Sequence, residues 1–199
     1  MNTTERKSRS YLIGGDSWGI GVFQHTNGVY GPTGQGIHSL LEQQGHSVVN
    51  ISKGGGSNWL TIDRLYQRWN SRQHCSFGVD PRDRIDFTLS QFDAVVFFQT
   101  DAFREWHFYV SRKGEQGTQW KQLPEKFIES LLEYNSLESK FDDYFNEIYL
   151  ELNNLGVPVL CVGGWSKLHP CIAKYPNLVP AVVSATQLLI PELKTDTYI

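Results

Sequence analysis

Short apolar runs alternate with amphipathic stretches along most of the chain. The apolar runs cover residues 11–13, 47–51, 92–98 and 157–162, and glycines follow three of them within a few positions. The run 92–98 shows no apolar–polar alternation, which is typical of a strand buried on both faces in a parallel sheet. We therefore expect four strands in a sheet of this kind.

Stretches with apolar residues at helical spacing separate the runs. They cover residues 36–45, 58–72 and 124–155, the last as one long helix or as two helices broken near Asn135. Strands that alternate with helices are the signature of right-handed βαβ crossovers. The pattern therefore predicts an α/β fold, whose functional residues follow the carboxyl ends of the strands.

Two stretches interrupt this alternation, a polar insertion at 73–91 and an aromatic-rich segment at 102–123. The second places aromatic side chains next to cationic ones, at Phe103, Trp106, Phe108, Tyr109, Trp120, Arg104, Arg112 and Lys113. Such a segment either packs its own aromatic side chains against the body of the protein or forms a lid over a site.

Length and charge narrow the class of protein. A chain of 199 residues makes one domain, and we expect a disordered polar N-terminus at 1–9 followed by a single domain at 10–199. With 18 basic and 21 acidic side chains, the net charge of −3 argues against a nucleic-acid partner. The sequence assigns no oligomeric state.

The cysteines and the hydropathy of the chain indicate in which cellular compartment the protein is expected. Cys75, Cys161 and Cys171 form no C-x-x-C arrangement, so free thiols are expected and a metal site is not. No apolar leader follows the first residues, and the longest apolar run, 94–98, is far shorter than the roughly 18 residues of a membrane span. We therefore expect a cytoplasmic protein without a membrane partner.

The turn after the first predicted strand carries the strongest candidate for chemistry. Ser17 follows Gly14, Gly15 and Asp16, so its hydroxyl would stand on a glycine-flanked turn between a strand and a helix. A serine in such a turn is placed to act as a nucleophile, and its own N–H can point at a developing oxyanion. The alternative is that Ser17 only caps the following helix.

The joins after the other strands also carry small or polar residues. The glycine-rich segment 54–57 lacks the endings of a P-loop or a dinucleotide fingerprint, which argues against a nucleotide ligand. Gln99 and Thr100 follow the third strand, and His169 follows the fourth.

Three of these segments together resemble the SGNH/GDSL hydrolase superfamily. The segment YLIGGDSWGIG at 11–21 is similar to the first block of that family, in which Gly-Asp-Ser follows a strand. The segments 48–57 and 99–104 resemble its second and third blocks in order and spacing. The resemblance covers roughly residues 10–165 and implies a three-layer α/β/α sandwich with a mostly parallel, flavodoxin-like sheet and no cofactor.

The resemblance also implies roles for individual residues. Ser17 would attack the acyl carbon, and the backbone N–H groups of Ser17 and of Gly55 or Gly54 would donate to the oxyanion. In the third block, Asp101 falls where the family has a donating Asn, and an ionised carboxylate cannot donate. A shift by one residue puts Thr100 there instead, and Gln99 is a further candidate.

The sequence departs from the family pattern at Asp101 and, a second time, at the general base. The family's last block reads Asp-x-x-His, and none of the six histidines has an acidic residue three positions earlier. His169 is the best placed, followed by Pro170 as the family's histidine often is, although a loop histidine that caps a backbone carbonyl is the alternative. Either His169 works in a dyad oriented by Asp101, or the true segment lies beyond residue 199 of a longer chain.

The expected function is a serine hydrolase that cleaves a carboxylic ester or an acetyl group through an acyl-serine intermediate. Its substrate would be a small-molecule or carbohydrate ester. The alternative is a non-catalytic SGNH-like binding module that uses the same cleft for a glycan or a protein partner.

Overall fold

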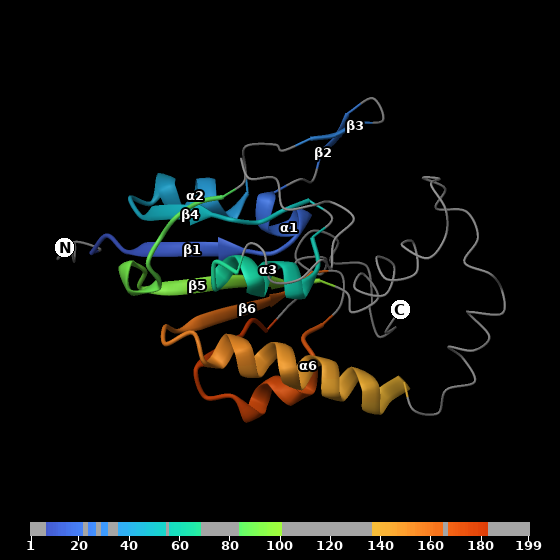
Figure 1. The fold of residues 1–199 in the computed structure, drawn as a ribbon. Coiled ribbons are helices and arrows are strands. Elements are labelled where there is room, and N and C mark those ends of the chain that lie inside the picture. Colours follow the sequence, from blue (N-terminus) through green and yellow to red (C-terminus); the bar gives the residue numbers. More distant parts are fainter. Residues whose placement is uncertain are drawn as a thin grey trace.

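A five-stranded, all-parallel sheet forms the centre of the computed structural model (Figure 1). The structure describes residues 7–21, 24–26, 29–31, 36–54, 56–68, 84–100, 137–164 and 167–182. The strands of the sheet are β1 (Ser10–Gly14), β4 (Ser47–Asn50), β5 (Ala94–Gln99), β6 (Val159–Gly163) and β7 (Leu178–Pro180).

The order of the strands across the sheet is β4-β1-β5-β6-β7. The first strand therefore lies between the second and the third in chain order, and the later strands add on one side. This is the flavodoxin-like order, in which the direction of strand addition reverses next to β1. The predicted α/β fold with a parallel sheet is confirmed, and so is the sheet order that the family resemblance implied.

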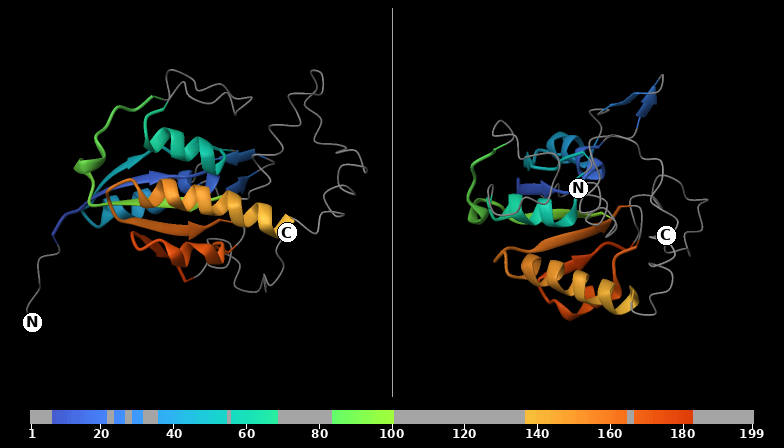
Figure 2. Two further views of the ribbon diagram at one scale, coloured as in Figure 1. Left: turned by 60° about the horizontal axis from the view of Figure 1, so that its bottom comes forward. Right: turned by 45° about the vertical axis from the view of Figure 1, so that its right-hand side comes forward.

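Helices cover both faces of the sheet. The helices α3 (Asn58–Leu65) and α6 (Leu137–Asn153) pack on one face, and α1 (Ser17–Ile20) and α2 (Ile37–Gln43) on the other (Figures 1 and 2). The strand β5 contributes to both layers, with Val95 and Phe97 in the first cluster and Val96 and Phe98 in the second. This two-sided burial explains why its sequence lacks alternation.

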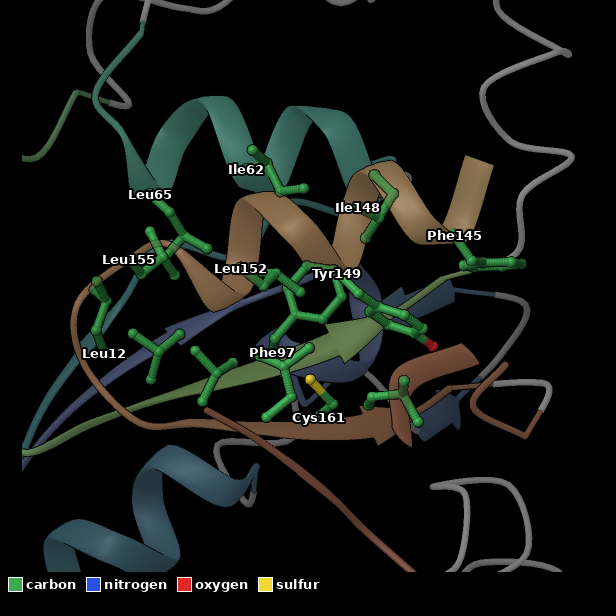
Figure 3. Close-up of a cluster of buried hydrophobic side chains, with 14 of the residues drawn as sticks. Leu12, Ile62, Leu65, Phe97, Phe145, Ile148, Tyr149, Leu152, Leu155 and Cys161 are labelled. Atoms are coloured by element: carbon green, nitrogen blue, oxygen red, sulfur yellow. The ribbon is translucent and has the colours of Figure 1, made fainter. Parts of the chain in front are cut away.

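The larger core lies between α6, α3 and the sheet (Figure 3). Four side chains of α6 at positions i, i+3, i+4 and i+7 are buried there: Phe145, Ile148, Tyr149 and Leu152. That spacing puts them on one face of the helix, as the apolar stripe predicts.

Several short elements were not predicted. The hairpin of β2 (Gln24–Thr26) and β3 (Val29–Gly31) forms a separate two-stranded sheet, and β7 extends the main sheet. Each of these strands has three residues. A run of three residues is too short to show the two-residue periodicity of a strand, which is why the pattern missed them.

The predicted helix 58–72 ends earlier than expected. The helix α3 stops at Leu65, and Gln67 has a left-handed backbone with φ of 55° that does not continue a helix. The aromatic-rich segment 102–123 and residues 124–136 lie outside the described residues, as does most of the insertion 73–91, whose last residues form the short 3₁₀ helix η2 (Leu89–Gln91).

The expected disordered N-terminus, 1–9, is described only from residue 7 onward. Ser8 donates to the carbonyl of Gly45, and the carbonyl of Arg9 accepts from the N–H of Ser47. These bonds attach the chain to the α2–β4 turn before β1 begins. In the described part of the chain, every helix is too short or too polar to cross a bilayer.

The turn after β1 needs glycine at position 15, and this generates a prediction. Gly15 has φ of +154°, and a Cβ there would lie 2.6 Å from Cβ of Phe98 and 3.0 Å from its carbonyl oxygen. Gly15→Ala should lower the free energy of unfolding by about 2–5 kcal/mol through backbone strain and overpacking. Guanidinium chloride unfolding measures the loss.

Gly45 provides the matched control because it has φ of +84° and no atom within 4 Å of an added Cβ. Gly45→Ala should cost only about 1–2 kcal/mol, from the left-handed backbone alone. Equal losses for the two variants would show that Phe98 does not restrict the turn.

Candidate active site

The turn between β1 and α1 is held by a buried carboxylate. Asp16 is 1% exposed, its Oδ1 accepts from the N–H of Trp18 at 2.9 Å, and its carbonyl accepts from Ile20 at 3.3 Å. Asp16 is thus the capping residue of α1, and Ser17 is the first residue inside the helix. The alternative in which Ser17 serves as the cap is therefore wrong, because Asp16 occupies that position.

The loop after β4 is bonded to the β1–α1 turn. The side chain of Asn50 donates from Nδ2 to the carbonyl of Gly19 at 2.8 Å and accepts at Oδ1 from the N–H of Ser52 at 3.0 Å. The N–H of Lys53 donates to the carbonyl of Gly15 at 3.0 Å. These bonds hold the two loops together at the C-terminal edge of the sheet, the edge where the strands end.

The glycine-rich bend continues from this loop. Gly54 is exposed and follows Lys53 directly, whereas Gly55 lies outside the described residues. A Cβ at Gly56 would lie 2.8 Å from the carbonyl oxygen of Lys53 and 3.6 Å from that of Gly15. The bend is therefore on the same edge of the sheet as Ser17, as the sequence predicts.

The end of β5 is bonded to the start of α3. Thr100 is 1% exposed, and its backbone pairs in both directions with the side chain of Asn58: its N–H donates to Oδ1 at 2.8 Å, and its carbonyl accepts from Nδ2 at 2.9 Å. Gln99 is also 1% exposed, and its carbonyl accepts from the N–H of Gly164 at 3.0 Å. Asp101 lies outside the described residues.

Four predicted site residues therefore come together. The backbone of Ser17, the bend at Gly54, and the strand-end residues Gln99 and Thr100 all lie at the C-terminal edge of the sheet, on neighbouring strands β4, β1 and β5 (Figure 1). This edge also lies next to the reversal of strand order, where open α/β sheets bind their ligands. Their catalytic roles remain predictions.

His169 lies beyond β6 and has a contact at each ring nitrogen. Nδ1 accepts from the N–H of Cys171 at 3.4 Å and lies 3.1 Å from its Sγ, while Nε2 lies 3.1 Å from Oδ1 of Asp142. The ring stacks on Phe145 with centroids 5.0 Å apart. His169 is thus the capping residue of the 3₁₀ helix η3 (Pro170–Lys174), although it caps an N–H and not a carbonyl.

Burial governs the protonation of this histidine. Desolvation lowers the pKa of His169, with Lys174 acting in the same direction and the Asp142 carboxylate opposing both. The ring is therefore neutral near pH 7, with Nδ1 as the acceptor and the proton on Nε2 directed at Asp142. A neutral imidazole of this kind has the protonation state that a general base requires.

Two residues near the edge were missed by the sequence reasoning. Asp142 lies on α6, 27 positions before His169, so no local motif could connect them. His38, in the first turn of α2, has Nδ1 3.5 Å from Nδ2 of Asn50, which in turn holds Gly19 of α1. His38 could have been found from the topology, because a helix that precedes a parallel strand begins at the C-terminal edge of the sheet.

The described cysteines have the surroundings of structural thiols. Cys161 and Cys171 are both free and buried. Burial raises the pKa of the Cys161 thiol to about 12, and burial likewise raises the pKa of Cys171. Within the described residues, no group of three or more His, Cys, Asp or Glu side chains is arranged to hold a metal ion. Cys75 lies outside them.

Comparison with known proteins finds structural similarity only. No family model and no curated protein sequence matches this chain. The crystal structure of AlinE4, an SGNH-hydrolase family esterase, matches 98% of this chain and 87% of its own, with 11% identity and a TM-score of 0.41. A variant of the same esterase matches with the same identity and coverages and a TM-score of 0.42.

The pKa of His169 generates a prediction about stability. Because its pKa is lower in the folded than in the unfolded chain, the unfolded state binds more protons at mildly acidic pH. The stabilisation by neutral His169 should be complete above about pH 6.5, the ordinary histidine value, and be lost as the pH falls through the folded pKa. His169→Gln should therefore reduce the loss of unfolding free energy between pH 7.5 and pH 5.5.

The measurement is urea unfolding at both pH values. His46→Gln is the matched control, since His46 lies before β4 at the opposite edge of the sheet and accepts from the N–H of Arg9. An acid dependence that is equally large in His169→Gln and in the wild type would contradict the prediction.

Proposed function

We propose that this chain is a serine hydrolase of the SGNH/GDSL type, which cleaves a carboxylic ester or an acetyl group through an acyl-serine intermediate. The observation that carries the proposal is the position of Ser17, the first residue of α1, directly after the carboxyl end of β1. Asp16 fixes the backbone at this point through its cap on α1. The structural similarity to an SGNH esterase is consistent with it.

In this proposal, the Ser17 oxygen attacks the acyl carbon as the general base takes its proton, and the base returns that proton to the alcohol as it leaves. Water then hydrolyses the acyl-serine. The backbone N–H groups of Ser17 and of Gly55 or Gly54 donate to the oxyanion. The bond from Lys53 to the carbonyl of Gly15 supports this arrangement, because it keeps the glycine-rich bend next to the Ser17 turn. Donors of this kind act without reorganisation when charge develops.

His169 is the proposed general base, with Asp142 in the role that the sequence gave to Asp101. A carboxylate on one ring nitrogen stabilises the imidazolium that forms when the base takes the serine proton. The contact between Asp142 and Nε2 supports this role, and Nδ1 acts as the base by exchanging its 3.4 Å bond from the N–H of Cys171 for the serine proton. The substrate is a small-molecule or carbohydrate ester, and no cofactor is required.

One observation favours the alternative, a non-catalytic binding module for a glycan or a protein. Both ring nitrogens of His169 have contacts that hold η3 against α6, so a purely structural role also accounts for its surroundings. A protein with the scaffold but without a working base would keep the cleft and lose turnover.

Covalent labelling distinguishes the two functions. A fluorophosphonate probe should label the wild type on Ser17, detected by mass spectrometry, and Ser17→Ala should abolish both the label and p-nitrophenyl acetate hydrolysis, lowering kcat by at least about 1,000-fold. Ser52→Ala is the matched control, because it removes a second hydroxyl near the same edge and should leave labelling intact. An unlabelled wild type that retains a glycan or protein ligand would establish the binding module instead.

The identity of the base is tested by two alanine variants. His169→Ala should lower kcat by about 100- to 10,000-fold, which is the usual contribution of a general base. His38→Ala should have little effect on kcat, since its ring contacts Asn50 of β4 at 3.5 Å and has no role in the proposed reaction. The reverse result would transfer the role of base to His38.

A further inference from the structure

The carboxamide of Gln99, the last residue of β5, has two ends with different surroundings. Its oxygen, Oε1, accepts from the phenol O–H of Tyr149. Its nitrogen, Nε2, is buried and has no hydrogen-bond partner in the described part of the chain. A buried donor without an acceptor costs folding free energy, and in a native protein it calls for a functional or structural explanation.

The hydrogen bonds of Tyr149 determine the orientation of this amide. The phenol oxygen accepts from the backbone N–H of His169 at 3.0 Å, and the hydroxyl has one proton to donate. With Oε1 of Gln99 facing it, that proton has an acceptor. With the amide reversed, Nε2 would donate to the phenol oxygen, and the buried hydroxyl proton would lose the acceptor that Oε1 provides.

Tyr149 remains a donor throughout the accessible pH range. It is 0% exposed, and burial raises the pKa of its phenol far above the ordinary value, with Cys161 contributing in the same direction. Figure 3 shows the phenol extending from α6 toward the sheet, with its hydroxyl oxygen toward the arrowhead ends of β5 and β6. The side chain therefore reaches the C-terminal edge from the helical layer.

The backbone of Gln99 is also fixed. Its carbonyl accepts from the N–H of Gly164 at 3.0 Å, and the residue pairs with Gly163 in the ladder between β5 and β6. Since Oε1 is held by Tyr149, the amide nitrogen is the one side-chain polar atom of Gln99 without a bonding partner in the described residues. It belongs to the strand end next to the Ser17 turn.

We propose that Nε2 of Gln99 is the side-chain donor to the oxyanion and that Tyr149 is a positioning residue for it. This inference rests on the proposed function. As Ser17 Oγ bonds to the acyl carbon, the carbonyl π electrons move onto the oxygen, and Nε2–H donates a hydrogen bond to it without transferring its proton. Gln99 would thus supply the donor that Asp101 lacks.

Thr100 is the rival donor, because its Oγ1 is also buried without a partner in the described residues. The observation that separates them is the bond from Tyr149. A threonine hydroxyl rotates freely about its own bond, whereas the amide of Gln99 has a dedicated partner that fixes which end is free. An oxyanion donor gains from being fixed before the reaction begins.

A double-mutant cycle with p-nitrophenyl acetate tests the proposal. Gln99→Leu should lower kcat by about 100- to 1,000-fold with little change in KM, since the bond forms with the transition state. Tyr149→Phe should lower kcat by about 10- to 100-fold by releasing the amide. The double variant should lose far less than the product of the two single losses, because the bond from Tyr149 to Gln99 no longer matters once Gln99 is replaced; only the bond from the N–H of His169 to Tyr149 is lost in addition.

Controls separate this role from a loss of folding. Tyr66→Phe removes a half-buried phenol at the end of α3, whose O–H donates to the carbonyl of Glu151 on α6 at 2.7 Å, and it should leave kcat unchanged. Gln99→Met serves as a second variant of similar length should Gln99→Leu fail to fold. Circular dichroism melting verifies that each variant is folded at the assay temperature.

Three outcomes would overturn the inference. If a folded Gln99→Leu or Gln99→Met variant keeps the wild-type kcat, Gln99 is not the oxyanion donor. If the kcat losses of the two single variants multiply in the double variant, Tyr149 has a structural role that is separate from Gln99. If kcat falls in Thr100→Val but not in Gln99→Leu, Thr100 is the oxyanion donor. If Ser17→Ala is inactive while the Gln99 variants are not, this inference fails alone; an inactive, unlabelled wild type ends both proposals.

Discussion

The pairing of β1 with β4 on one side and β5 on the other is the constraint on which the site depends. Because all three strands run in parallel, the turns that follow them meet at one edge of the sheet. The polar contacts then act locally: Asn50 bonds α1 to the end of β4, and Asn58 bonds α3 to the end of β5. Polar side chains far apart in the sequence are brought together by the sheet and not by any local motif.

The sequence predicted those parts of the fold that repeat with a clear period. The unbroken apolar run of β5 and the apolar stripe of α6 each indicated an element that the structure contains. The three-residue strands β2, β3 and β7 carry no readable period, and the end of α3 depends on the left-handed backbone of Gln67. These features follow from turn geometry and tertiary packing, which residue patterns report weakly.

The candidate site was predictable where it follows strand ends and not where it depends on contacts between elements. The positions of Ser17 and Gly54 at the C-terminal edge were predicted from their place after apolar runs, whereas their catalytic roles stay predictions. The sequence left open whether Ser17 caps α1, because Asp16 and Ser17 are both good capping residues and only the backbone geometry separates them. The pairs Asp142–His169 and Tyr149–Gln99 join different elements, so no spacing in the sequence could have indicated them.

The bond pair between Asn58 and Thr100 has a consequence for motion. A side-chain amide that both donates to and accepts from one backbone unit reproduces the pairing of two neighbouring strands. The first residue of α3 therefore acts as one more rung at the end of β5, inside the protein and away from water. Local opening of α3 then also breaks the two hydrogen bonds between Asn58 and Thr100. The helix and Thr100 should therefore open together, as a single cooperative unit.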